Sequence, residues 1–296
     1  MGHLASIIIP AHNEDKVIAT TLTALLPGIA DNSIEVIVVC NGCTDKTARI
    51  AASMSSALIC LETPVASKVR ALNLGDAKAR WFPRIYQDAD VVLTMDAVAG
   101  IVETLRKGPF LAAAPAMRME YHEASWAVRS YYAIWQALPY VQEGLIGVGV
   151  YALSEEGRRR FDSFPDIIAD DGYIRALFQP YERTVIENCW SLVRAPNDLR
   201  GLLKIKTRSR RGRYQLARKF PQLMGNEHKE YGKALLPLAG SLSLWPKIAV
   251  YLYVNLIARF LANRHITGKV NGEWERDESS RDAAIRNNKE SHGKSK

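Results

Sequence analysis

Two stretches of sequence decide the fold: ASIIIPAHNED at residues 5–15 and EVIVVCNGCTD at residues 35–45. Each begins with a run of apolar residues and passes directly into polar ones. The runs lack the alternation of a half-exposed strand, so they predict strands buried on both faces, as in parallel sheets. A third such run covers residues 57–61. Helical periodicity follows the runs at residues 16–26, 44–54 and 68–79.

This alternation predicts βαβ units and a doubly wound, mostly parallel α/β sheet flanked by helices. Asn13 is placed to cap the first helix, and Thr44-Asp45 the second. Ligands of doubly wound sheets bind at the carboxyl ends of the strands. Because polar residues follow each apolar run, we expect a ligand site at that edge.

Composition limits the class of protein. The chain has 296 residues, of which 48% are hydrophobic and 24% charged, which excludes disordered, fibrous and polytopic membrane proteins. A net charge of +8 favours phosphate-bearing ligands or an anionic membrane surface as partners, and we expect no nucleic acid partner. The four cysteines are too scattered for a secreted disulfide framework, so a cytoplasmic location is expected.

Four motifs occur in order at the expected edge. They are Pro10-Ala11-His12-Asn13-Glu14, Cys40-Asn41-Gly42-Cys43-Thr44-Asp45, Lys68 followed by Ala71-Leu72-Asn73 and Gly75, and Asp88-Ala89-Asp90. In these motifs the sequence resembles the family 2 glycosyltransferases of the GT-A fold, over about residues 5–180. The resemblance implies a GT-A-like sheet and inverting transfer of a sugar to an acceptor hydroxyl. The donor is expected to be a nucleoside-diphosphate sugar, most often UDP-linked in that family.

The resemblance also assigns the donor site. It places Pro10, Ala11, Glu14, Asn41, Asp45, Lys68 and Asp88 at the nucleotide sugar. Asp90 is the expected direct ligand of Mg²⁺ or Mn²⁺, with Asp88 at the ribose or a metal-bound water. Such a cation neutralises the charge that grows on the diphosphate leaving group. Asn41 stands where the family often has Asp; its amide oxygen can still accept an N–H from the base, without the charge.

Inverting transfer also needs a general base. In Ile168-Ala169-Asp170-Asp171-Gly172-Tyr173, Asp171 aligns with the family's base, and Asp170 is the neighbour that tunes its pKa. The alternative is that one of the two only caps the helix at residues 173–178. The stretch at residues 147–151, GVGVY, resembles the family's acceptor-side glycine segment.

Other interpretations of these motifs stay open. Cys40 and Cys43 form a Cys-X-X-Cys between a strand and a helix, where redox motifs lie, although it follows the second strand and not the first. Cys60 and Cys189 do not supply the second pair that a zinc site would need. A sugar-nucleotide-forming nucleotidyltransferase would need a glycine-rich start that is missing here. A non-catalytic nucleotide-sugar-binding or membrane scaffold protein is the other alternative.

The C-terminal third is basic and then apolar. Residues 200–219 hold nine Lys or Arg, and Arg208, Arg210 and Arg211 could hold phosphates or lipid head groups, or form a solvated face. The Gln-X-X-Arg-Trp motif of processive members is missing, which favours addition of single sugars.

We expect a helix at residues 247–263 to lie on a membrane surface without crossing it, with Lys247, Asn255, Arg259 and Asn263 on its polar half. The alternative is a helix docked on protein. The location would then be peripheral on the cytoplasmic membrane face, with a lipid-linked or cell-envelope saccharide as acceptor. The expected regions are 1–200 for the glycosyltransferase domain (halves 1–91 and 92–200), 201–263 for the helical region, and 264–296 for a disordered tail.

Overall fold

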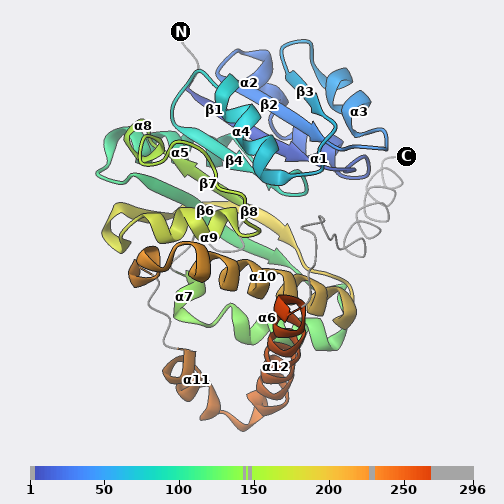
Figure 1. Cartoon of the computed structure of the whole chain (residues 1–296), viewed down its shortest axis with the longest axis vertical. Coiled ribbons are helices and arrows are strands. Elements are labelled where there is room, and N and C mark those ends of the chain that lie inside the picture. Colours follow the sequence, from blue (N-terminus) through green and yellow to red (C-terminus); the bar gives the residue numbers. More distant parts are fainter. Residues whose placement is uncertain (1–3, 143–144, 146–148, 227–230, 268–296) are drawn as a thin grey trace. The chain divides into compact units, whose positions relative to one another are not determined.

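The computed structural model describes residues 4–142, 145, 149–226 and 231–267 (Figure 1). The chain divides into two compact units. The first contains residues 1–118 and 144–193, and the second contains residues 119–143 and 194–296. The predicted boundaries at residues 91 and 200 separate regions by function. The division into compact units does not test such boundaries, so they stay a prediction. The tail expected from residue 264 lies outside the described residues from residue 268 onward.

The first unit is built around an eight-stranded sheet in the order β3-β2-β1-β4-β7-β6-β8-β5. The strands are β1 Ala5–Ala11, β2 Ile34–Asn41, β3 Ile59–Thr63, β4 Arg84–Gln87, β5 Val92–Leu93, β6 Ala112–Glu120, β7 Val150–Leu153 and β8 Arg183–Arg194. β1 pairs in parallel with β2 and β4, and β2 pairs in parallel with β3. The predicted parallel βαβ arrangement is confirmed for these four strands.

The other half makes the sheet mixed. β7 runs antiparallel to both β4 and β6, and β5 runs antiparallel to β8. The pairing of β7 with β4 places Tyr151 opposite Tyr86, and the two rings stack with centroids 5.0 Å apart. Helix α8 (Glu155–Arg158) and helix α9 (Asp170–Leu177) follow β7. β7 therefore joins the parallel half of the sheet to its antiparallel half.

Helices cover both faces of the parallel half, as Figure 1 shows. Every residue of β1 and β2 is buried, so successive side chains need partners on opposite faces. Ile7 and Ile9 belong to the core formed with α1, α2, α3 and α5. Ile8 and Val39 face α4. These helices are α1 Ile18–Thr23, α2 Leu26–Ala30, α3 Thr47–Met54, α4 Lys68–Lys78 and α5 Met95–Lys107.

The start of the first predicted helix differs from the expectation. Residues 16–26 form α1 and the beginning of α2, with Pro27 in the first turn of α2, where its missing N–H is tolerated. Asn13 does not cap α1, because Val17 precedes that helix without a side-chain cap. Instead, Asn13 adopts a positive φ of 52° and its Oδ1 accepts the backbone N–H of Thr44 at 2.6 Å. It joins the two loops that follow β1 and β2.

The second unit is helical. Its helices are α6 Trp126–Trp135, α7 Pro139–Gln142, α10 Leu199–Lys219, α11 Tyr231–Ala239 and α12 Trp245–Thr267. Asp198 caps α10 by accepting the N–H of Gly201 at 2.8 Å. Helix α12 packs against α6 and α10. The predicted helical C-terminal region is thus present, and residues 264–267, expected in the tail, are the last residues of α12.

The side chains that α12 buries differ from the predicted division into a polar and an apolar half. Its buried side chains are Tyr251, Val254, Ala258 and Ala262. Asn255, predicted on a solvated face, is half-buried and accepts a hydrogen bond from Arg210 of α10 at 3.1 Å. The apolar face remains exposed at Leu252, Tyr253, Leu256 and Phe260. Helix α12 therefore docks on α6 and α10 through one face and still presents an apolar surface on another.

The close approach of α4 to the sheet predicts a stability effect at Gly75. An added Cβ would lie 2.6 Å from Cγ2 of Ile8 and 3.1 Å from Cγ2 of Val39. We expect Gly75→Ala to lower the free energy of unfolding by about 1–3 kcal/mol, because overpacking outweighs the gain in helix propensity of about 1 kcal/mol.

Gly100→Ala in α5 is the matched control. An added Cβ there would lie 3.4 Å from Sγ of Cys189, an ordinary contact, so we expect a gain of at most about 1 kcal/mol from helix propensity. Urea unfolding followed by circular dichroism measures both variants. Equal effects at the two positions would contradict the packing of α4 described here.

Candidate active site

The Asp-X-Asp motif forms a tight turn directly after β4. The backbone N–H of Asp88 donates to the carbonyl of Gly149 at 2.7 Å, and the N–H of Val91 donates to the carbonyl of Asp88 at 3.2 Å. Gly149 has a φ of +65°, and a Cβ there would collide with the side chain of Val91. Glycine meets both demands without strain. The turn is therefore fixed against the start of β7.

Lys68, Asp88 and Asp170 come together at this turn. Nζ of Lys68 lies 2.7 Å from Oδ1 of Asp88 and 3.0 Å from Oδ1 of Asp170. Lys68 is the first residue of α4, whose N-cap is Ser67. The hydroxyl of Tyr151 donates to Oδ2 of Asp170 at 3.1 Å. Three residues that the sequence assigned to separate motifs thus form one charged cluster.

The charges in this cluster shift one another's pKa values. Burial lowers the pKa of Lys68, but the carboxylates of Asp170 and Asp88 outweigh it, and the net pKa is raised. For Asp88, burial raises the pKa, Lys68 lowers it, and the carboxylates of Asp170 and Asp90 raise it, giving a value of about 6. The negative charge around Asp88 is therefore not fully balanced by one lysine.

Asp170 and Asp171 have different surroundings. Asp170 is 3% exposed and bound by Lys68 and Tyr151, whereas Asp171 is half-buried and its Oδ1 accepts the N–H of Gly172 at 2.7 Å. Helix α9 begins at Asp170, after Ala169, which makes no side-chain cap. Neither acid is thus the capping residue of α9. The more accessible of the two is the one predicted as general base.

Asn41 ends β2 inside the predicted base pocket. Its side chain is fully buried, and its Nδ2 donates to the carbonyl of Ala11 at 2.8 Å. Its Oδ1 is buried and accepts no hydrogen bond among the residues that the structure describes. An unsatisfied buried acceptor is costly, so a donor from a bound ligand would stabilise it. This is the chemistry expected for recognition of a base N–H.

The other predicted nucleotide residues are placed around the same two loops. Pro10 and Ala11 lie within β1 and are buried, so they offer backbone and not side chains. The backbone N–H of Glu14 donates to Oγ1 of Thr47 at 2.6 Å. The Asp45 carboxylate accepts the N–H of Thr47 at 2.9 Å and that of Asp15 at 3.2 Å. Asp45 therefore joins the loops to the start of α3.

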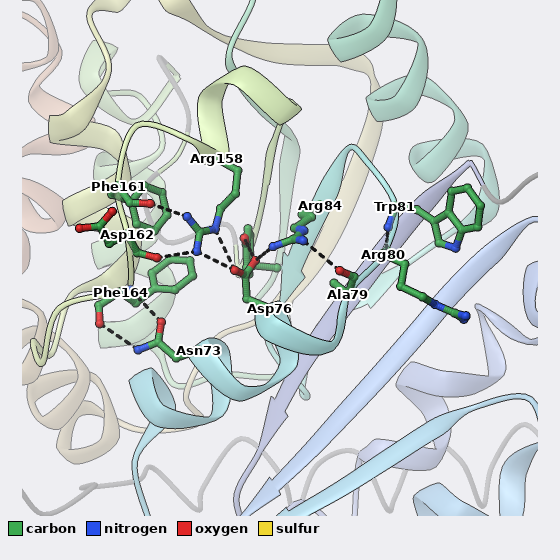
Figure 2. A network of polar contacts seen from close by, with 12 residues as sticks. Asn73, Asp76, Ala79, Arg80, Trp81, Arg84, Arg158, Phe161, Asp162 and Phe164 are labelled. Atoms are coloured by element: carbon green, nitrogen blue, oxygen red, sulfur yellow. Dashed lines mark hydrogen bonds and ion pairs between the residues drawn. The ribbon is translucent and has the colours of Figure 1, made fainter.

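A network of polar contacts fixes α4 to the segment that leads to Asp170 (Figure 2). The carboxylate of Asp76 is bound by Arg84 and Arg158, each at 2.7 Å, and by the hydroxyl of Tyr86 at 2.6 Å. Asn73 both donates to the carbonyl of Phe164, at 3.0 Å, and accepts its N–H, at 2.8 Å. These contacts therefore fix the helix that carries Lys68 to the segment that precedes Asp170.

Sequence reasoning missed the supporting residues of this site. Asn73 was recognised only as part of a motif, and Tyr151 only as the end of the glycine segment. Asp76 and Arg158 were not recognised at all, because nothing in a single sequence pairs residues that lie so far apart. The two residues of that glycine segment at positions 147 and 148 lie outside the described residues.

The arginines predicted to hold phosphates or lipid heads lie in α10, in the second unit. Arg210 donates to Asn255. Lys206, also on α10, lies over the rings of Trp135, Tyr131 and Tyr132, at 4.3, 5.0 and 5.1 Å from their centroids. Burial lowers the pKa of Lys206 to about 7.

Comparison with known proteins identifies the class. Residues 6–150 match the family model "Glycosyl transferase family 2". No curated protein sequence matches the chain significantly. Among solved structures, the chain is similar to mannosyltransferase PcManGT from Pyrobaculum calidifontis in complex with GDP-Man and Mn²⁺. The identity is 19%, the match covers 100% of this chain and 82% of that one, and the TM-score is 0.57.

A second similar structure is glucosyl-3-phosphoglycerate synthase from Mycobacterium tuberculosis in complex with Mn²⁺, UDP and glucosyl-3-phosphoglycerate. The identity is 18%, with 73% of this chain and 79% of that one covered, and the TM-score is 0.55. These structures confirm the GT-A fold. Residues 6–150 carry a family 2 glycosyltransferase domain, and the chain is a glycosyltransferase. The nucleotidyltransferase and scaffold alternatives receive no support.

Proposed function

We propose that the chain is an inverting, metal-dependent glycosyltransferase that moves a sugar from a UDP-linked donor to an acceptor hydroxyl. The observation that carries the proposal is the cluster of Lys68, Asp88 and Asp170 at the carboxyl edge of the sheet. It holds positive charge and carboxylates beside the loops that carry Asn41. A diphosphate donor needs both kinds of group within a few ångström of each other.

Asp88 and Asp90 are the residues that would hold a divalent cation. Asp90 is exposed, and the Asp88 side chain is 38% exposed, so both carboxylates can be reached by an ion. Among the described residues no group of three or more His, Cys, Asp or Glu could hold a metal, which suits an ion whose shell is completed by phosphate and water. When bound, the cation would neutralise charge on the leaving diphosphate.

The remaining residues would orient the donor and move a proton. Lys68 is placed to attract the diphosphate, and Asn41 Oδ1 to accept an N–H from the base. Both uracil and guanine present such an N–H. We propose UDP because donors in the resembling family are most often UDP-linked, and GDP serves as the comparison. Asp171 would take the proton of the acceptor hydroxyl. Asp170, which is held by Lys68 and Tyr151, would orient Asp171.

Metal dependence is tested by calorimetric titration of UDP with and without Mn²⁺. We expect UDP to bind at least about tenfold more weakly without Mn²⁺, or in Asp90→Ala with it. Because the pKa of Asp88 is about 6, protons compete with the metal below that pH, and the metal effect should fade there. Asp96→Ala, which removes an exposed carboxylate of α5, is the control. Equal affinities throughout contradict a metal bridge, and tighter binding of GDP contradicts the proposed base.

The assignment of the base predicts a separation of binding from chemistry. We expect Asp171→Asn to bind UDP normally and to lower transfer, or hydrolysis of the donor, by roughly 10²–10⁴-fold. Asp170→Asn should weaken donor binding instead, because Lys68 loses one of its two carboxylate partners. Steady-state kinetics with a UDP-sugar that the wild-type enzyme transfers or hydrolyses measures both variants. If Asp170→Asn alone abolishes turnover while binding is intact, the base is Asp170.

We further propose that the enzyme works at the cytoplasmic membrane face on a lipid-linked or cell-envelope acceptor. Over the described residues, Leu242–Arg264 is long and apolar enough to cross a membrane, and 17% of that stretch is buried. Arg210 contacts the middle of α12 at Asn255, and a guanidinium at the bilayer centre costs about 2.5–3.5 kcal/mol. Surface binding through the exposed face of α12 is therefore favoured over a span.

Vesicle flotation tests this surface. We expect the protein to float with anionic vesicles and to be released by high salt, because the basic α10 adds about 1 kcal/mol per well-placed charge. Leu256 and Phe260 are 66% and 58% exposed, so replacing either by Glu should weaken binding about tenfold or more without disturbing the fold. Asn263→Glu places the same charge at an exposed polar position of α12 and is the control. Flotation that is indifferent to all three changes contradicts the proposal.

A further inference from the structure

Arg118 and Trp190 form an exposed pair on two neighbouring strands of the first unit. Arg118 lies near the end of β6 and Trp190 near the end of β8, and the two strands are neighbours in the sheet. The guanidinium carbon of Arg118 lies 3.2 Å from the centroid of the Trp190 ring. At so short a distance the planar guanidinium must lie flat on the ring, because its nitrogens would otherwise collide with ring atoms. Trp190 is 40% exposed, and Arg118 is exposed as well.

Trp190 is on the face of the sheet that carries the charged cluster. Its neighbour Cys189 belongs to the core that includes residues of α5. Successive residues of a strand point to opposite faces, so Trp190 points away from that core. In β7, Ala152 belongs to the same core, whereas Tyr151 before it points the other way and donates to Asp170. Trp190 and Tyr151 therefore lie on one face of the sheet, together with Asp170.

Strand β5 connects the level of Trp190 with the Asp-X-Asp turn. β5 starts two residues after Asp90 and pairs with β8, with Leu93 opposite Ser191. Leu93 lies three residues beyond Asp90, and Trp190 lies one residue beyond Ser191 in the same direction. This gives roughly 13 Å along the strands at about 3.3 Å per residue. A short oligosaccharide spans such a distance.

The pair lies on the side of the turn that the donor leaves open. In the sheet, β2, which ends in Asn41, and β8 lie on opposite sides of β4, which leads into Asp88. In the proposed function the base of the donor binds at Asn41 and its diphosphate at the turn. The donor therefore extends from β2 to the turn, and the β8 side remains for the acceptor.

The two side chains offer two kinds of contact. Flat stacking uses none of the five N–H donors of Arg118, which stay directed outward in the plane of the guanidinium. Over the part of the chain that the structure describes, this guanidinium makes no ion pair or hydrogen bond, and Glu120, the acid that ends β6, is paired with Arg194 at 3.0 Å. A fork of N–H donors suits a carboxylate or phosphate, and an exposed indole suits the apolar C–H face of a sugar ring.

We propose that Trp190 and Arg118 form an acceptor subsite for a sugar ring that carries a carboxylate or a phosphate. The ring packs on the exposed part of the indole, and the oxyanion accepts the N–H fork of Arg118. Because the pair lies away from Asp90, the ring bound here is a neighbour of the ring that is glycosylated. The assignment to the acceptor rests on the proposed function, whereas the binding of an anionic sugar does not.

Saturation-transfer difference NMR tests the subsite with defined probes. Glucose 6-phosphate and glucuronate carry the two kinds of oxyanion, and glucose is the neutral comparison. Saturation of the aromatic protons of the full chain should pass to the C–H protons of a sugar that lies on Trp190. We expect both anionic sugars to bind at least about tenfold more tightly than glucose, because charge-assisted hydrogen bonds are the strong ones. The titrations are run without nucleotide and again with UDP and Mn²⁺.

Two variants separate the contributions of the two side chains. Arg118→Gln should weaken binding of both anionic sugars about tenfold and leave glucose unchanged. Trp190→Leu should weaken all three sugars and lower the aromatic transfer. Arg159→Gln and Trp126→Leu are the matched controls, because Arg159 and Trp126 are exposed at 75% and 55% and lie elsewhere in the chain. Both controls should bind as the wild type does, and circular dichroism verifies that all four variants fold.

Each outcome decides the proposal. Binding under either condition supports the subsite if Arg118→Gln and Trp190→Leu change it as stated. Equal affinities for glucose and the anionic sugars, signals that neither variant alters, or no signal from any probe overturns it. Weaker binding of UDP to Arg118→Gln would assign the arginine to the donor instead. If the sugars bind as expected and UDP does not bind, the anionic sugar site stands, and its acceptor role is wrong together with the proposed donor.

Discussion

The ammonium of Lys68 lies between the carboxylates of Asp88 and Asp170, at 2.7 and 3.0 Å, and the geometry of the active site depends on this contact. The three residues come from the start of α4, the turn after β4 and the start of α9. Two adjacent carboxylates repel each other, which favours uptake of a proton by one of them. Partial burial and this repulsion raise the pKa of Asp88 to about 6 even with Lys68 beside it. The cluster is thus prepared to receive further positive charge.

A second group of charges keeps the first in place. The carboxylate of Asp76 forms ion pairs with Arg84 and Arg158, and Asn73 makes paired hydrogen bonds to the backbone of Phe164 (Figure 2). Both acceptors are on α4, one and two turns beyond Lys68. Removing one partner of a buried ion pair costs about 3–5 kcal/mol, so this network binds α4 firmly to the segment before Asp170. The position of Lys68 therefore depends on side chains that lie outside the charged cluster itself.

The second unit combines an exposed apolar helix face with a basic helix. Helix α12 buries a line that contains small side chains against α6 and α10 and leaves large apolar side chains exposed. An exposed apolar face of this kind marks an interaction site. Lys206 lies among Tyr131, Tyr132 and Trp135, and burial lowers its pKa to about 7. A lysine in such surroundings carries its charge only part of the time near neutral pH.

The sequence by itself determined the parallel half of the sheet, because β1 and β2 are continuous apolar runs that can only be buried on both faces. It also predicted the residues at the carboxyl edge, since turns and caps are local, and the motifs there led to the family. Only the tertiary structure decided that Asn13 bridges two loops, that Asn255 faces α10, and that Asp76 holds two arginines. Each of these depends on contacts between distant segments, which local periodicity does not encode. The different surroundings of Asp170, which is buried beside Lys68, and Asp171, which is half-buried, have the same origin: adjacent residues of one type are distinguished only by what folds against them.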